Sequence, residues 1–435
     1  MRVWDVFALM GLVLITAACG ATTPPTPLPA TSAPATAVMP AVISATIAPV
    51  HPTATQVVTP QTAQPLTLTL WVPESFAPGA ERGGDILGAR LSAFEADHPG
   101  VKIDYALKAP YGKGGITDWL IQLRELMPER LPDAAIVDSR DLDALAKLGL
   151  LQPLQRALPS GAYWELLPPA QSIARQGGVW SNQPLALDLE HLVYDTRRVN
   201  SPPVSWQDVL TTTTSFAFAA DDSDTFLLHY LHDGGSLNPR EHPALDSSVM
   251  QNILEYYQRA RANGNLSEAT VGMQSAREVM PLFVAGQAPL AQVWARDFLI
   301  ERARLPNAAA AAIPTRDGQP AAVVSGWTYV ILTSDPARQR VAADYLMWLS
   351  EPAFLAEWTR AAQWIPASSS AFTQALSPAA YVDTLRVLME HAIIAPSFDA
   401  QRPYADAWRQ AAQAVLNGQL TPADAAYRAL TGILQ

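Results

Sequence analysis

Cysteine is almost absent from this 435-residue chain. The single cysteine, Cys19, excludes an internal disulfide, so the folded part depends on its hydrophobic core. Charged residues are also scarce, at 16%, whereas hydrophobic residues make up 49%. A chain of this length and composition has room for two or three domains with a sizeable core.

Clustered positive charge is missing as well. Lys and Arg number 29 against 40 Asp and Glu, which gives a net charge of -11. Binding to nucleic acid needs grouped Lys and Arg that neutralise phosphates. No such run occurs in the chain, and we therefore expect no nucleic-acid partner.

Common catalytic motifs are absent too. The sequence contains no G-x-S-x-G, P-loop, H-E-x-x-H or CxxC pattern. His229 and His232 lie three residues apart on a predicted helix, so a metal site is an alternative there; we expect neither a metal nor a cofactor. A glycosidase needs two carboxylates across a cleft. Asp188 with Asp222 is the pair that this alternative would use, against our expectation that the protein is not an enzyme.

The N-terminus has the form of a secretory signal. Arg2 precedes an apolar run from Val6 to Ile15, which is too short to span a bilayer. Small residues then lead to Cys19, an arrangement that resembles a bacterial lipobox, in which the cysteine sulfur takes a diacylglycerol. We expect residues 1–18 to be a lipoprotein signal peptide and Cys19 to be lipidated. An ordinary signal with an incidental cysteine is the alternative.

The next segment, residues 19–65, is rich in Ala, Thr and Pro and has almost no charge or apolar periodicity. Such a composition cannot bury enough surface to offset its ordering entropy, and its prolines favour extended conformations. We expect a disordered tether that holds the folded part away from a membrane.

Alternating strands and helices follow. The patterns predict a strand over 66–72, a helix over 85–97, a strand over 101–107, a helix over 116–127 and a buried strand over 133–138. This order indicates parallel βαβ units and an α/β fold.

Ligands of parallel sheets bind at the carboxyl ends of the strands. That rule selects five residues at the ends of predicted strands or just after them: Trp71, Glu74, Asp138, Ser139 and Arg140. Capping of the helix that begins near Asp141 is an alternative role for Asp138 and Ser139, and it is compatible with a place in the cleft.

The stretch from Asn182 to Asp195 is apolar almost throughout, which is typical of a strand covered on both faces. Asp188 inside it is costly to bury and needs a partner. We expect this strand to carry the chain from one lobe to a second, with Asp188 facing the cleft between them.

The remaining patterns predict further strands and helices. Strands are expected over 215–219, 288–294, 308–314 and 323–331, and helices over 225–232, 247–262, 336–349, 353–361, 405–416 and 421–434. Trp364 and Tyr404 are expected in loops.

Several segments together resemble a known family. In order and spacing they are FEADHPGVKIDY, LPDAAIVDSRDLDALAKLGLLQPL, NQPLALDLEHLVYD, SWQDVL, the Phe283 to Trp294 segment and the Gly326-Trp327 strand. From Leu66 to the C-terminus the chain is similar to extracellular solute-binding protein family 1. These are the sugar-binding receptors of ABC importers, of which the maltose-binding protein is the best-known member.

The resemblance implies a periplasmic-binding-protein-like type II fold, with two α/β lobes joined by hinge strands and a ligand cleft between them. The first lobe is then expected to comprise 66–187 plus about 322–355. The second is expected to comprise 188–321 plus about 356–435.

Sugars are held by flat aromatic rings and by planar carboxylates. The resemblance implies that Trp294 and Trp327 stack on the ligand and that Asp222 and Asp224 approach it from a strand–helix junction. Gly326, Trp364 and Tyr404 complete the expected ligand-binding set. Packing in the core is the alternative for any tryptophan, and helix capping is the alternative for the acids.

The implied function is that of a lipid-anchored receptor on the outer face of the cell membrane. It would bind a sugar or oligosaccharide by hinge closure and deliver it to an ABC permease. We expect a monomer. The alternative is a sensor or surface receptor with the same fold that binds a solute such as a polyamine and has no transport role.

Overall fold

The structure, a computed structural model, describes residues 66–237 and 245–433. Its strands are β1 (Leu66–Val72), β2 (Val101–Leu107), β3 (Ala134–Asp138), β4 (Arg175–Gln176), β5 (Val179–Trp180), β6 (Gln183–Asp195), β7 (Phe216–Ala217), β8 (Leu290–Trp294), β9 (Ala308–Ala311), β10 (Ala322–Ile331), β11 (Ile365–Pro366) and β12 (Ala392–Ile394).

The α-helices of the described ranges are α1 (Gly84–Asp97), α2 (Ile116–Leu126), α3 (Leu142–Lys147), α4 (Ser160–Trp164), α5 (Pro168–Ala174), α6 (Trp206–Thr211), α7 (Ser223–His232), α8 (Ser247–Ala262), α9 (Met280–Val284), α10 (Ala295–Glu301), α11 (Pro336–Leu349), α12 (Pro352–Ala362), α13 (Ser369–Ala375), α14 (Ala379–Glu390), α15 (Phe398–Leu416) and α16 (Pro422–Ile433). None of these helices is both long and apolar enough to cross a bilayer. The predicted signal peptide, Cys19 and the tether lie outside the described residues.

One sheet organises the fold. Its strand order is β2-β1-β3-β10-β6-β8-β7, with β11 and β9 also paired to β6 and β12 paired to β10. β1 runs parallel to both β2 and β3, as the alternation of strand and helix patterns predicts. Leu87 and Phe94, two turns apart on α1, are both buried, because helical periodicity places them on one face toward the core.

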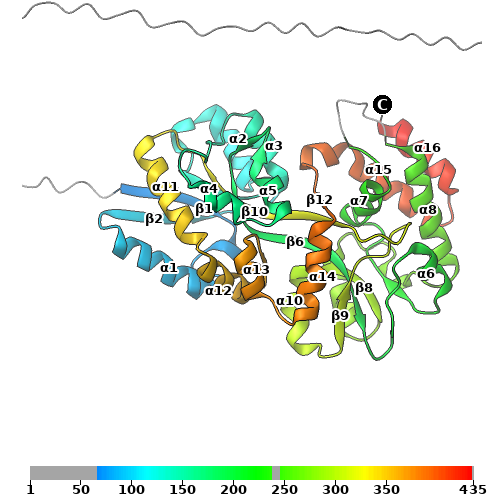
Figure 1. The fold of residues 1–435 in the computed structure, drawn as a ribbon. Helices are drawn as coiled ribbons and strands as arrows, with labels where there is room; N and C mark the ends of the chain where they lie inside the picture. The colour runs from blue at the N-terminus through cyan, green and yellow to red at the C-terminus, as the bar shows by residue number, and fades with distance from the viewer. Residues whose placement is uncertain (1–65, 238–244, 434–435) are drawn as a thin grey trace, which may run out of the picture. The chain divides into compact units, whose positions relative to one another are not determined.

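β6 and β10 pass between the two halves of this sheet (Figure 1). Along its first half β6 pairs with β10, where Asp188 lies opposite Ser325. Along its second half it pairs with β8 and β9, and here Glu190 lies opposite Trp294. β6 has neighbouring strands on both sides and is covered on both faces. Its sequence is therefore apolar almost throughout.

A second hydrophobic cluster joins α7, α8, α15 and α16, with Phe226, Tyr257 and Trp408 in its centre. Here one expectation was wrong, because α15 begins at Phe398 and includes Tyr404, which was expected in a loop. The Ser397 side chain caps the helix by accepting a hydrogen bond from Ala400 N. That cap, with the packing of Tyr404 on Trp408, outweighs the helix-breaking tendency of Pro403.

Candidate functional site

A cavity of about 660 Å³ lies where the ends of several strands meet, at the level of β6 and β10. Its volume is in the range typical of small-molecule sites. The predicted site residues that line it are Glu74, Asp138, Arg140, Asp188, Trp294, Gly326, Trp327 and Trp364. Segments far apart in the sequence therefore contribute to one wall.

Asp188 is a carboxylate of the cavity wall that is held in place by backbone groups. Its Oδ1 accepts hydrogen bonds from Leu189 N at 3.0 Å and from Arg296 N at 3.2 Å. No protein donor among the described residues reaches its Oδ2. Only 6% of the residue is exposed, and this burial raises the pKa of Asp188 to about 7. The second oxygen is therefore available to a ligand hydroxyl.

Three tryptophans belong to the same wall, but they are not equally accessible. Trp294 ends β8 and is only partly buried. Trp327 and Trp364 are 8% and 3% exposed, and both rings pack on Phe76, with centroids 5.4 and 5.7 Å from its ring. Trp294 is therefore the tryptophan with the most surface free for stacking.

Sequence reasoning missed several wall residues, and three of them are arginines. Arg82, Arg277 and Arg296 line the cavity together with the predicted Arg140. Arg277 Nη1 is 3.0 Å from Asp297 Oδ1. Arg296 follows Trp294 by two residues, so the strand-end rule would have found it. Arg82 lies in a turn and Arg277 in a short 3-10 helix, Ala276–Glu278, and neither follows a strand.

Arg296 has an unusual environment. Its guanidinium lies 4.0 Å from the centroid of the Trp364 ring. It forms no ion pair with any described residue, and its Nε is buried without a hydrogen-bond partner. Burial lowers the pKa of Arg296 from its usual value. An unpartnered buried donor is costly, so a ligand acceptor at this position would be stabilising.

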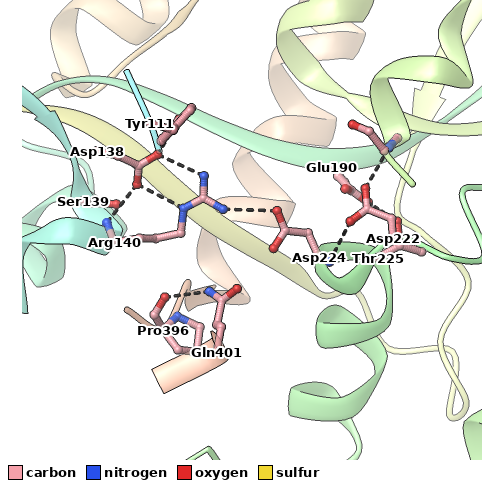
Figure 2. A network of polar contacts seen from close by, with 12 residues as sticks. Tyr111, Asp138, Ser139, Arg140, Glu190, Asp222, Asp224, Thr225, Pro396 and Gln401 are labelled. Carbon is pink, nitrogen blue, oxygen red and sulfur yellow. Dashed lines mark hydrogen bonds and ion pairs between the residues drawn. The ribbon is translucent and has the colours of Figure 1, made fainter. Parts of the chain in front are cut away.

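Arg140 joins two parts of the wall through a network of polar contacts (Figure 2). Asp138 Oδ1 accepts from Arg140 N and Nε at 2.9 and 3.1 Å, and its Oδ2 accepts from Arg140 Nη2 at 3.0 Å and from the Tyr111 hydroxyl at 2.8 Å. On the opposite side Arg140 Nη1 donates to Asp224 Oδ2 at 3.1 Å. Although Arg140 is buried, its two carboxylate partners raise its pKa well above the usual value.

Beyond Asp224 the network continues to Asp222, Thr225 and Glu190 (Figure 2). Asp222 caps α7, because its Oδ1 accepts from Asp224 N at 2.9 Å and its Oδ2 from Ala276 N at 2.8 Å. Glu190 Oε2 accepts from Thr225 and Gln292. Burial raises the pKa of Glu190 well above its ordinary value and that of Asp222 to about 6. Thus Asp222 is committed to capping.

Five predicted site residues are not among those lining the first cavity: Trp71, Ser139, Asp222, Asp224 and Tyr404. Trp71 is buried in the core beneath Lys108 Nζ, which is 4.5 Å from the ring centroid. The Ser139 hydroxyl accepts a hydrogen bond from Gly326 N at 3.0 Å. Tyr404 packs in the second hydrophobic cluster.

The two histidines considered for a metal contact separate groups. His229 is buried and lies T-shaped against Trp206, and its burial lowers its pKa to about 3. His232 Nε2 is 2.9 Å from Asp317 Oδ1. In the part of the chain that the structure describes, no cluster of three or more His, Cys, Asp or Glu is arranged to hold a metal ion.

Residues 89–383 match the family model described as bacterial extracellular solute-binding protein. The chain belongs to that family. Its members bind solutes and are not enzymes, which agrees with the absence of catalytic motifs in the sequence. No curated protein sequence matches this solute-binding protein significantly.

Solved structures share the fold of this solute-binding protein. A cyclic alpha-maltosyl-1,6-maltose binding protein from Arthrobacter globiformis aligns with a TM-score of 0.66 at 20% identity, covering 85% of this chain and 98% of that one. A maltose/maltodextrin-binding domain from Bdellovibrio bacteriovorus bound to maltotriose aligns at 0.61 and 16%, covering 85% and 99%. An ABC transporter solute-binding protein from Thermotoga lettingae bound with alpha-D-tagatose aligns at 0.64 and 20%, covering 84% and 98%. The type II periplasmic-binding-protein fold is thereby established.

Proposed function

We propose that this protein binds a sugar or oligosaccharide outside the cytoplasm and delivers it to the permease of an ABC importer. The observation that carries the proposal is the presence of the partly exposed Trp294 and the free Asp188 Oδ2 in one cavity. A ring of a sugar has C–H faces that pack on an aromatic plane and hydroxyls that pair with a carboxylate. The ligands named for the structural neighbours, maltotriose and tagatose among them, support the same class.

The proposed mechanism is closure of two lobes about β6 and β10. Wall residues such as Glu74 and Asp138 belong to the β1–β3 side, whereas Trp294 and Arg296 belong to the β8 side. A ligand that contacts both sides gains contacts only in the closed state, so it shifts the equilibrium toward closure. Within this proposal α12 belongs to the first lobe, because Trp358 packs on Phe76 with ring centroids 5.3 Å apart. The chain was expected to pass into the second lobe near residue 356. Within this proposal it does so only after α13.

The arginines of the wall make a polyamine the less favourable solute. The four carboxylates of the wall are matched by four arginines, so its ammonium groups would meet no excess of negative charge and would lie beside Arg82, Arg277 and the unpaired Arg296. Like charges in a partly desolvated cavity repel one another. A neutral saccharide instead supplies hydroxyl acceptors for these donors. A permease gene pair next to this gene supports transport, whereas a neighbouring sensor kinase gene supports the sensor alternative.

A thermal-shift screen of the purified protein tests the ligand class. The panel contains neutral mono- and oligosaccharides, sugar acids, polyols and spermidine. We expect a saccharide to raise the melting temperature and spermidine to have no effect. Trp294→Ala should remove the shift, while the matched control Trp164→Ala, at an exposed tryptophan of α4, should keep it. Stabilisation by spermidine alone would refute the proposed class.

The lipid anchor is a separate part of the proposal that depends on Cys19. In cells fed a radiolabelled fatty acid, the wild-type protein should carry label and sediment with membranes. Cys19→Ser should lose the label and leave the membrane fraction. An unlabelled wild-type protein would favour the ordinary signal peptide.

A further inference from the structure

A second cavity, of about 490 Å³, adjoins the first. The two have three wall residues in common, Pro110, Tyr111 and Arg140. Two cavities that share side chains are compartments of one cleft, with those side chains as the partition between them. The second compartment is formed mainly by the segments around α2, α3 and the start of α15.

Of the two larger side chains in the partition, Arg140 is fixed by ion pairs, whereas the ring of Tyr111 is exposed. Arg140 is only 10% exposed and is fixed by Asp138 and Asp224, with Phe398 4.3 Å from its guanidinium carbon. Tyr111, in contrast, is 46% exposed although its hydroxyl is held by Asp138. A ligand chain can therefore pass over the Tyr111 ring without breaking the ion pairs below it.

Aromatic surface continues across the partition. The Tyr111 ring centroid lies 5.7 Å from that of Trp327 in the first compartment and 5.8 Å from that of Phe398 in the second. Phe398 is partly exposed. Successive aromatic rings along a cleft suit a ligand that repeats the same apolar face, as linked sugar rings do.

Polar groups accompany these rings in the second compartment. Asp141 precedes α3, but its side chain makes no capping hydrogen bond. Thr117 Oγ1, its polar neighbour, is buried without a hydrogen bond of standard geometry. Desolvation by burial raises the pKa of Asp141 to about 6. Thr117 is the side-chain partner of the Asp141 carboxyl, and the remaining lone pairs of that carboxyl can accept hydrogen bonds from the hydroxyls of a sugar.

We propose that the second compartment is a further saccharide-binding site, so that the solute is an oligosaccharide extending past Tyr111 onto Phe398 and Asp141. This inference rests on the proposed function, since it assumes that a saccharide occupies the first compartment. It adds a requirement for ligand length. A monosaccharide would occupy only the first compartment. It would make no contacts with Phe398 or Asp141 in the second.

Isothermal titration with ligands graded by length tests the inference on the full-length protein. The probes are glucose, maltose, maltotriose and maltopentaose, with the corresponding cello- and xylo-oligosaccharides. We expect affinity to rise with length in the series that binds. Phe398→Ala and Asp141→Asn should each weaken the longest ligand about tenfold and leave the shortest ligand that binds unchanged.

Asp143→Asn is the matched control, because Asp143 lies two residues after Asp141, in α3, and is exposed, with Lys147 as its ion-pair partner at 3.9 Å. It should change neither affinity. If the long ligand binds both variants as tightly as wild type, or if affinity does not rise with length, the second compartment is not a binding site and the proposed function stands. If no saccharide of any length binds the wild type, the proposed function fails together with this inference.

Discussion

Asp188 and Glu190 lie two residues apart on β6, and both are buried carboxyl groups with raised pKa values. Their surroundings nevertheless differ. Each has one oxygen without a donor among the described residues, but Asp188 lines the cavity of about 660 Å³, whereas Glu190 lines one of only about 10 Å³ and has Thr225 and Gln292 on its other oxygen. Burial, charge and a free oxygen are therefore shared by both residues. The space beside the free oxygen is what makes Asp188 the candidate for ligand binding.

The change of strand partner explains this difference. Asp188 lies opposite Ser325 of β10, at the level where the cavity opens. Glu190 lies opposite Trp294 of β8, and Gln292 of the same strand reaches its carboxylate. Within two residues β6 thus passes from a cavity of about 660 Å³ to one of about 10 Å³.

The strongest test of the comparison is Asp188→Ala. We expect it to lower ligand affinity by about 100-fold or more, and to abolish the ligand-induced rise in melting temperature, because a desolvated acceptor is lost. The melting temperature of the unliganded protein should stay within a few degrees of wild type, since removal of a buried charge offsets the two freed backbone N–H groups. Titration calorimetry and thermal melts measure the two effects, and wild-type affinity in the variant would show that Asp188 is misassigned.

Glu190→Gln should do the reverse, with an effect on stability and none on binding. Burial raises the pKa of Glu190 well above that of the unfolded chain. Its contribution to stability is then complete below the unfolded pKa and is lost as pH rises toward the folded pKa. Glutamine has no such loss, so the stability of the variant relative to wild type should increase as pH rises from 5 to 8. Urea unfolding at both pH values measures this gain, and parallel pH curves would contradict it.

The pH dependence of binding sharpens the comparison further. Burial raises the pKa of Asp188 to about 7. A ligand hydroxyl donates more strongly to the ionised carboxylate, so affinity should fall about tenfold from pH 8 to pH 6. The dependence should vanish in Asp188→Asn and persist in Glu190→Gln. A profile that persists in Asp188→Asn would assign the titration to another group.

The smallest effect is expected for Ser139→Ala. The Ser139 hydroxyl accepts a hydrogen bond from Gly326 N. Like Glu190, this side chain is therefore expected to contribute to stability and not to ligand binding. Its removal should cost about 1 kcal/mol of unfolding free energy and leave ligand affinity unchanged. Denaturant titration and calorimetry distinguish this outcome from a direct ligand contact, for which affinity would fall without loss of stability.

Sequence patterns predicted much of the architecture because buried strands and amphipathic helices have distinct periods. β1 to β3 with α1 and α2, the long β6 and the place of Asp188 in the cavity wall follow from such local patterns. The face that a strand residue presents does not follow when both faces are buried. Trp71 was for that reason expected in the cleft and is found in the core.

The parts that sequence reasoning missed depend on long-range contacts. Arg82 reaches the cavity from a turn and Arg277 from a short 3-10 helix, and neither lies at the end of a predicted strand. Tyr404 was placed in a loop because Pro403 normally ends a helix, whereas the Ser397 cap starts α15 earlier. Tertiary packing on Trp408 then keeps the tyrosine in the helix.

Gly326 has a consequence for anyone who wishes to retarget this receptor. A Cβ atom at this position would lie 2.7 Å from the carbonyl oxygen of Ala186 and 2.9 Å from a methyl group of Leu187. Larger residues there would push apart the paired strands β6 and β10. New specificity is therefore more readily engineered at Arg82 and Tyr111, outside the strands, while the sequences of β6 and β10 are kept.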